Sequence, residues 1–309
     1  MDALSEILRL AHFNADVTVD ATAHEPWCVS VPSSAAISRA YLVVEGECHL
    51  QATGIEEATL RAGDLVFLPG GQAHLLGSNL AVEARSLASI VKTPVAGELL
   101  PVRIGGNGAA TRWIAFSFSC ERHLAESLLA SLPPSMFVDM AGAQTVEWLL
   151  DSLALTLTNT AAPALGASAT RARLAEAVFV EALARYIHSL PPGGTGWLAG
   201  LNDRYIGRAL ALIHGRPSES WTVERLGAQV GLSRSALAER FGQVMGEPLF
   251  AFLTRWRLQL AAEMLLATSR PITAIAKDAG YESAAAFSAV FKRTFRKPPS
   301  VWRRKRRRA

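Results

Sequence analysis

Residues 280–300 read GYESAAAFSAVFKRTFRKPPS, and this stretch decides the fold of the C-terminal third of the chain. Gly280 suits a tight turn, because glycine adopts a positive φ at little cost. Ser283 is a residue type that caps helices, and Phe287 and Phe291 follow it at the i, i+4 spacing of one buried helix face. A short helix, this turn and a capped second helix form the helix-turn-helix pattern.

The same pattern occurs once before, in the stretch TVERLGAQVGLSRSALAERF. It predicts a helix capped by Thr222, a turn at Gly231 and a second helix capped by Ser233. The buried positions of the two second helices lie 50 residues apart and the turn glycines 49, so the later turn is one residue longer. Between the units, residues 248–268 are long enough for one amphipathic connecting helix, and Pro271 opens the next helix.

Charge is concentrated in the same part of the chain. Residues 201–309 hold 20 Lys and Arg against 8 Asp and Glu, a net charge of +12, although the whole chain carries only +4. The first 200 residues therefore carry −8. A basic domain of this kind indicates a polyanionic partner, with a merely solvated basic surface as the alternative.

Residues 205–304 resemble the DNA-binding domain of the AraC/XylS family of bacterial transcription regulators. The resemblance rests on three elements, GLSRSALAERF, WRLQLAAEMLL and PITAIAKDAGYESAAAFSAVFKRTFRKPPSVWRR. It implies an all-α domain whose two recognition helices enter successive major-groove segments on one face of double-stranded DNA, about 34 Å apart. It further implies a transcriptional regulator and makes RNA polymerase an expected partner.

Carried over by position, the resemblance directs Ser235, Ala238 and Glu239 of the first recognition helix toward base edges. Arg234 and Arg240 are expected to lean toward phosphates. Arginine can bind guanine bidentately, and glutamate can accept a hydrogen bond from cytosine N4. The full set expected to bind DNA is Ser233, Arg234, Ser235, Ala238, Glu239, Arg240, Ser283, Ala284, Ala285, Ser288, Lys292 and Arg293.

The second recognition helix offers little with which to read bases. The matching positions are Ala284, Ala285, Ser288 and Ala289. The alanine methyl groups can touch a thymine methyl but form no hydrogen bond. Cations follow at Lys292, Arg293, Arg296, Lys297 and in the tail RRKRRRA, which is either a phosphate-binding arm or a solvated end. The first unit is therefore expected to supply most base discrimination, and the second phosphate anchoring and shape readout.

The front of the chain has a different texture. From Pro26 to about Phe118, short β runs alternate with Gly- and Pro-rich turns, which predicts a sandwich or small barrel. From about residue 121 the pattern becomes helical, with apolar stripes over 146–157 and 171–190. The second stripe either packs into the domain core or pairs with its copy in a homodimer. The sequence PPGGTG ends it, and we expect an α+β chain with domains at 1–195 and 200–309.

Part of the front resembles a cupin. In GDLVFLPGGQAHLLGSN, the residues Gly63, Pro69, Gly71 and His74 fit the second cupin motif, and Asn79 falls one place late. The stretch AYLVVEGECHL resembles the end of the first motif. Most of residues 1–190 resembles the cupin sensor domain that precedes many AraC-type modules, which implies a β-barrel with a trailing helical dimerisation segment.

The metal ligands of a cupin are missing. The first-motif glutamate position is Arg39, and the preceding VPSSAAIS holds no histidine. Since a catalytic metal needs about three protein ligands, His74 is expected to be a core or pocket residue, and no metal or cofactor is expected. A small barrel can still hold one small-molecule effector. Arg39, His49 and His74 are its candidate lining, the rival being a filled barrel that only dimerises.

These patterns favour a DNA-binding transcriptional regulator, not an enzyme, controlled by a small molecule or other signal at the cupin-like domain. One alternative is a cupin-type enzyme localised by its basic domain. Another is an oxidant-sensing regulator that uses Cys28, Cys48 or Cys120. No apolar run is long enough to span a membrane, and Asp2 and Glu6 stand where a signal peptide is basic or apolar, so we expect a cytoplasmic protein.

Overall fold

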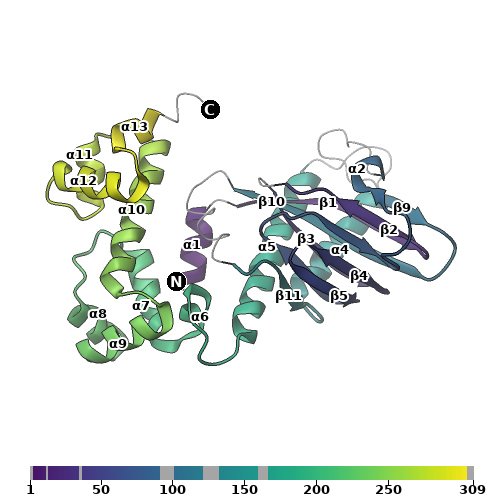
Figure 1. Cartoon of the computed structure of the whole chain (residues 1–309), viewed down its shortest axis with the longest axis horizontal. Helices are drawn as coiled ribbons and strands as arrows, with labels where there is room; N and C mark the ends of the chain where they lie inside the picture. The colour runs from purple at the N-terminus through teal and green to yellow at the C-terminus, as the bar shows by residue number, and fades with distance from the viewer. Residues whose placement is uncertain are drawn as a thin grey trace. The chain divides into compact units, whose positions relative to one another are not determined.

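The computed structural model of the protein describes residues 3–11, 13–34, 37–90, 101–120, 132–158 and 166–304. Close contacts divide the chain into two compact units (Figure 1). One unit contains the β-strands and the two helices that follow them. The other contains everything from Leu190 onward together with the first helix of the chain. Each unit is described by itself below.

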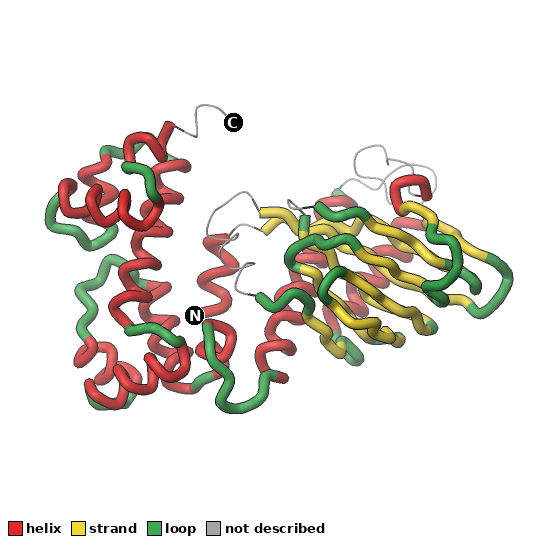
Figure 2. The backbone as a smooth tube through the Cα atoms, in the orientation of Figure 1, coloured by secondary structure: helices red, strands yellow, loops and turns green. Residues whose placement is uncertain are grey.

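The first unit consists of two β-sheets that share one apolar core (Figure 2). The larger sheet has the order β11–β6–β3–β10–β1–β9, formed by β1 (Phe13–His24), β3 (Ser38–Glu45), β6 (Asp64–Leu68), β9 (Pro101–Gly105), β10 (Ala110–Cys120) and β11 (Met136–Asp139). The smaller has the order β5–β4–β7–β2–β8, formed by β2 (Cys28–Val31), β4 (Glu47–Ala52), β5 (Ile55–Arg61), β7 (His74–Gly77) and β8 (Arg85–Ser86). A short helix, α2 (Leu87–Ile90), follows β8. The β1–β9 and β2–β8 pairs are parallel, and the other pairs are antiparallel.

Strand β3 illustrates how the two faces of the larger sheet are used. Successive side chains of a strand point to opposite faces, and Tyr41 and Val43 belong to the core between the sheets. The outer face is covered by α5 (Ala167–Ser189), against which α4 (Gln144–Thr158) packs. There, the ring of Phe179 in α5 lies 5.1 Å from Phe67 and 4.9 Å from Phe118, centroid to centroid. The expected α+β arrangement, with a β-sheet domain followed by helices, is confirmed.

Two boundaries in this unit differ from the prediction. Strand β1 begins at Phe13, well before Pro26, in a stretch that the sequence leaves open between a short helix and an extended arm. Strand β11 lies beyond residue 121, where only helices were expected. It has four residues and exists by pairing with the edge of β6, so it is too short for a periodic pattern to reveal.

The second unit is entirely helical in the ranges that the structure describes. Its elements are α1 (Ala3–Ala11), α6 (Trp197–Asn202), α7 (Arg204–Gly215), α8 (Val223–Val230), α9 (Arg234–Met245), α10 (Leu249–Ala267), α11 (Ile272–Asp278), α12 (Ala284–Phe295) and α13 (Pro299–Arg304). The pairs α8–α9 and α11–α12 are the two predicted helix-turn-helix units, and α10 is the single predicted connecting helix. Phe287 and Phe291 are fully buried in a core that α10 and Trp302 complete, as their spacing predicted.

Two helices that are separated by a single residue open the helical unit after residue 190. Helix α6 ends at Asn202, and α7 begins at Arg204. Asp203 between them has an extended backbone, and its carboxylate accepts from the N–H groups of Tyr205 and Ile206, both at 2.9 Å. This side-chain cap starts a new helix.

Helix α1 packs against α7, and Ala3 and Glu6 are buried. By its contacts it therefore belongs to the helical unit, although it precedes the first strand in the sequence. Within the described ranges, no helix has both the length and the apolar character needed to cross a membrane.

Candidate functional site

Each helix-turn-helix unit is held by one glycine and one capping serine. Gly231 has φ 82°, and Ser233 Oγ accepts from Ala236 N at 3.2 Å at the start of α9. In the second helix-turn-helix unit, Gly280 has φ 78°, and Ser283 Oγ accepts from Ala286 N at 3.1 Å. These turn and cap predictions are confirmed. They fix where each second helix starts, and hence which residues its outer face presents.

Arg257, in the middle of α10, connects the two units. Its guanidinium donates to the carbonyls of Pro217 and Glu219, both at 2.7 Å, in the loop before α8. The same guanidinium lies against Gly280, where an added Cβ would come within 3.0 Å of it. Burial lowers the pKa of Arg257. Its role in joining the loop before α8 to the turn of the second unit was not predicted from the sequence.

Of the twelve residues expected to bind DNA, the outer face of α9 and its cap carry six, and every one is exposed: Ser233, Arg234, Ser235, Ala238, Glu239 and Arg240. Leu237 and Phe241 are buried on the opposite side. Several of the exposed side chains interact with one another or with neighbouring helices. Glu239 accepts from Gln243 at 3.1 Å, and Arg234 pairs with Glu224 of α8 at 2.9 Å.

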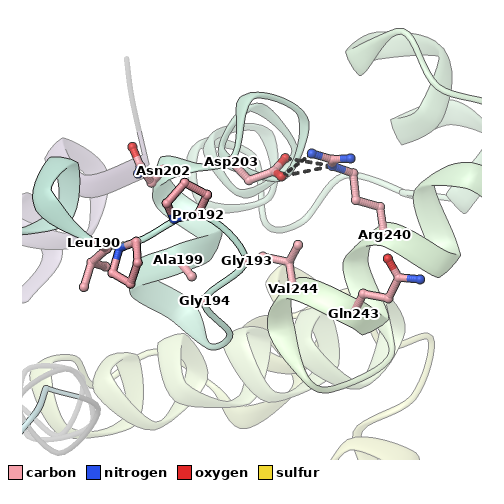
Figure 3. A pocket seen from close by; sticks show the side chains of 11 residues that line it. Leu190, Pro192, Gly193, Gly194, Ala199, Asn202, Asp203, Arg240, Gln243 and Val244 are labelled. Carbon is pink, nitrogen blue, oxygen red and sulfur yellow. Dashed lines mark hydrogen bonds and ion pairs between the residues drawn. The ribbon is translucent and has the colours of Figure 1, made fainter.

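Arg240 is held more firmly, by Asp203 (Figure 3). Its Nε lies 3.0 Å and its Nη2 2.6 Å from Asp203 Oδ2, and its guanidinium lies over the Tyr205 ring, 5.3 Å from the centroid. Burial acts to raise the pKa of Asp203, but hydrogen bonds from Arg240 and from the backbone of Ile206 and Tyr205 lower it overall. A pocket of about 500 Å³ adjoins the pair, between residues 190–194 and the C-terminal half of α9.

The face of α12 differs from that of α9. Ser283, Ala285 and Ala289 are exposed, and Ala284 and Ser288 are half-buried. Lys292 and Arg293 are exposed and form no ion pair with any residue in the described ranges. Arg296 and Lys297 are also exposed, and residues 305–309 of the basic tail lie outside the described residues. Helix α12 thus presents small side chains followed by unpaired cations.

In the unit that contains the β-sheets, the hydrogen bonds of His74 define its protonation. Its Nδ1 lies 2.8 Å from the carbonyl of Gln72, which can only accept, so Nδ1 carries the proton. Its Nε2 therefore accepts from the Tyr41 hydroxyl, at 2.6 Å. Burial lowers the pKa of His74; the Gln72 bond opposes this and the charge of Arg39 adds to it. A neutral His74 with both ring nitrogens engaged has no lone pair left for a metal.

The expected effector-pocket residues do not all come together. Arg39 has the same strand parity as Tyr41 on β3, so it lies on the inner face near His74, as its effect on the pKa of both groups requires. His49 instead alternates with the core residues Cys48 and Leu50 and lies beside Thr59 and Glu57, at 3.2 and 3.5 Å. The strand parity of β4 could have excluded His49 from the interior.

A cupin metal centre does not fit this arrangement. Arg39 occupies the first-motif glutamate position, and a guanidinium repels a metal cation. Among the residues that the structure describes, no three His, Cys, Asp or Glu side chains are grouped closely enough to hold an ion. The interior is a packed apolar core that includes Trp27 stacked on Trp113, with 6.3 Å between ring centroids. An open pocket of about 610 Å³ remains at the rim of the smaller sheet, with His74 in its wall and Ser30, Gln51 and Ser86 around it.

The described cysteines have little thiolate character. Cys28 and Cys48 are buried, and burial raises the pKa of both thiols, that of Cys48 to about 12. Reactive cysteines require the opposite, a lowered pKa and solvent access. The side chain of Cys120 lies outside the described residues.

Comparisons with known proteins agree with both halves of this description. A family model described as cupin matches residues 2–188, and a helix-turn-helix domain model matches residues 226–305. An AraC-like transcription regulator of Streptomyces antibioticus is 30% identical over 98% of this chain and 99% of its own length. The chain belongs to the AraC family. A further AraC-like regulator from Streptomyces lividans is 31% identical, over 98% of both chains.

The chain is also similar to one further sequence relative and to one solved structure. The transcriptional regulator AlkR of Acinetobacter baylyi is 29% identical over 98% of this chain and 99% of its own length. The solved AraC-type DNA-binding protein of Chromobacterium violaceum is 27% identical, covers 35% of this chain and 96% of its own, and has a TM-score of 0.33. This chain is an AraC-family transcriptional regulator with an N-terminal cupin domain, and its C-terminal domain is of the DNA-binding type.

Proposed function

We propose that this AraC-family regulator binds promoter DNA by inserting α9 and α12 into successive major-groove segments, one turn of DNA apart. The observation that carries the proposal is the pair of capped second helices, each with one buried face and one exposed face, joined by a single connecting helix. In this proposal α9 reads bases through Ser235, Ala238 and Glu239. Ser233 and Ser283 cap the two helices. The phosphate contacts come from Arg234, Arg240, Lys292 and Arg293.

Two functions are separated at residues 195–200. The part of the chain before this boundary, except α1, senses a signal and dimerises. Residues 200–309 bind DNA. Helices α4 and α5 are the proposed homodimer surface, because each carries an exposed apolar side chain, Trp148 at 55% and Val180 at 41% exposure. The regulator would act in the cytoplasm and contact RNA polymerase at the promoter. The signal is a small molecule bound at the cupin domain, and it can shift DNA binding only by its differential affinity for two states of the protein.

Binding-site selection followed by footprinting tests the DNA-binding part of this proposal. The full chain at physiological salt should protect promoter DNA in two segments spaced by one helical turn. Two matched variants should each remove one protected segment. Phe241→Ala removes the buried core residue of the first helix-turn-helix unit, and Phe287→Ala removes that of the second. No protected promoter DNA with the unaltered chain would contradict the proposal.

We further propose that the cupin domain is not an enzyme. The support is the Tyr41 hydrogen bond to Nε2 of His74, the nitrogen that would otherwise be free to bind a metal, and the guanidinium of Arg39 beside it. Elemental analysis of the purified chain should find no stoichiometric metal. A metal content near one per chain, lost on His74→Ala, would overturn this part of the proposal.

A further inference from the structure

Helix α10 is the structural link between the two helix-turn-helix units, and each unit packs on a different stretch of it (Figure 1). In its first half, the ring of Phe252 lies 5.7 Å from that of Phe241 in α9, centroid to centroid. In its second half, Leu265 belongs to the core that Phe287 and Phe291 of α12 also form. The orientation of one unit relative to the other therefore depends on α10 and on the contacts that cross it.

Arg257, in the middle of α10, makes such a crossing contact. Its Nε donates to the carbonyl of Pro217 and its Nη2 to the carbonyl of Glu219, both at 2.7 Å. The same guanidinium lies against Gly280 of the second helix-turn-helix unit, where an added Cβ would be 3.0 Å from Cζ and Nη1. Burial raises the pKa of Tyr281, the next residue, and the charge of Arg257 acts against this, so the phenol lies near the guanidinium too.

The two segments that this guanidinium joins are each fixed within their own helix-turn-helix unit. In the loop before α8, the indole of Trp221 is buried and its Nε1 donates to the carbonyl of Arg216 at 2.9 Å. Thr222, the next residue, caps α8. In the second unit, the ring of Tyr281 lies 5.5 Å from that of Phe287 in α12, centroid to centroid. A displacement of either reading helix is therefore transmitted to the contacts of the guanidinium.

We propose that Arg257 is a positioning residue that fixes α12 relative to α9, and that it thereby determines which spacing between two DNA segments the protein accepts. This inference rests on the proposed function, since it requires both helices to bind DNA. A change in spacing by one base pair moves a segment by about 3.4 Å along the DNA axis and turns it by about 35°. To follow that change, the two units would have to break charge-assisted hydrogen bonds at a half-buried guanidinium, which are stronger than neutral ones.

Three DNA duplexes test the inference by fluorescence anisotropy with the full chain. One is the duplex that the unaltered chain selects, and the others have one base pair inserted or deleted between its two protected segments. The unaltered chain should bind either altered duplex at least about tenfold more weakly than the original, and Arg257→Gln no more than about threefold more weakly. Arg255→Gln is the matched control, because it removes the same charge from α10 but breaks a pair with Glu247 that does not reach the second unit. Its spacing preference should equal that of the unaltered chain.

Arg257→Lys gives a second test should Arg257→Gln prove too unstable to bind DNA. Lysine keeps the charge but lacks the planar fork that reaches two carbonyls, so its spacing preference should be intermediate. A residue that only stabilises the fold would, when changed, weaken binding to all three duplexes by the same factor. That outcome for Arg257→Lys, or for a folded Arg257→Gln, overturns the inference and leaves the proposed function standing. Absence of two protected segments with the unaltered chain contradicts the proposed function itself.

Discussion

At the scale of single residues, Asp203 combines two tasks that the sequence does not show to be related. It caps α7 and it holds Arg240 on the exposed face of α9. The pair is partly exposed, so it contributes little to stability, about 0–1 kcal/mol. Its larger consequence is that one arginine expected to meet phosphate is occupied in the DNA-free protein.

The Asp203→Asn variant separates these tasks, because asparagine also caps helices well but carries no charge. Arg240 should then be free to contact phosphate. DNA affinity should rise by a similar factor on all sequences, and the slope of log affinity against log salt should steepen by about 1. Asp278→Asn is the matched control. It also removes one negative charge from the helical unit, but the arginine that it releases, Arg270, does not lie on α9. Equal effects of the two variants in a salt titration would show that only net charge matters.

His214 makes the stability of the helical unit depend on pH. It is buried in α7 beside Trp256, with 4.3 Å between ring centroids, and burial lowers its pKa to about 4, an effect that the backbone of Ala3 only partly opposes. The unfolded chain has a His pKa of about 6.5. Between these values the unfolded state binds more protons, so the free energy of unfolding falls as pH drops from about 6.5 to about 4, by at most about 3 kcal/mol.

Amide hydrogen exchange in α7 and α10 as a function of pH measures this loss. The His214→Phe variant, which cannot be protonated, should show a flatter dependence between pH 6.5 and 4. His188→Phe, an exposed histidine in α5, should behave like the unaltered chain. A pH dependence that His214→Phe leaves unchanged would assign the effect to other groups.

At the scale of elements, α9 and α12 have the same construction and different outer faces. Both are twelve-residue helices with a serine cap and a buried pair of residues at i, i+4 spacing. These features were predictable because capping and helical periodicity are local properties of the sequence. The difference between the faces was predictable too, since alanines replace polar residues on α12. The ion pairs of Arg234 and Arg240 were not, because their partners come from other helices.

The two helices should therefore fail differently when altered. Glu239→Ala on α9 should relax sequence preference at one base position, at about 1–3 kcal/mol for the preferred base. Lys292→Ala on α12 should weaken all sites alike and reduce the salt slope by about 1. Binding-site selection and salt titration on both variants measure this, with Lys277→Ala on α11 as a control. Stronger base preference under α12 than under α9 would contradict this division of labour.

At the scale of the whole molecule, the first helix belongs to the unit that the end of the chain forms. Helix α1 packs on α7 and contributes the buried Ala3 and Glu6, while only one residue separates it in sequence from β1 of the other unit. Sequence order alone assigns α1 to the front domain. Its docking partner lies about two hundred residues further on, where no local pattern identifies it.

Deleting residues 1–11 should consequently destabilise the helical unit and leave the β-sheets intact. The buried surface of α7 and the ring of His214 would lose their cover, so amide exchange in α7 should accelerate while exchange in β3 and β10 stays unchanged. Replacing Ala3 with Asp, which buries a charge at the same contact, should have the same effect in the full chain. Faster exchange in the strands alone would show that α1 stabilises the cupin domain instead.

The sequence by itself determined the two helix-turn-helix units, their caps and turns, the connecting helix, the cupin-like texture of the front and the missing metal ligands. All of these depend on residue types at short, regular spacings. Only the tertiary structure decided which distant side chains meet: Tyr41 with His74, Asp203 with Arg240, and α1 with α7. The physical reason is that such pairs depend on strand register and helix packing, which join residues 33 or more positions apart.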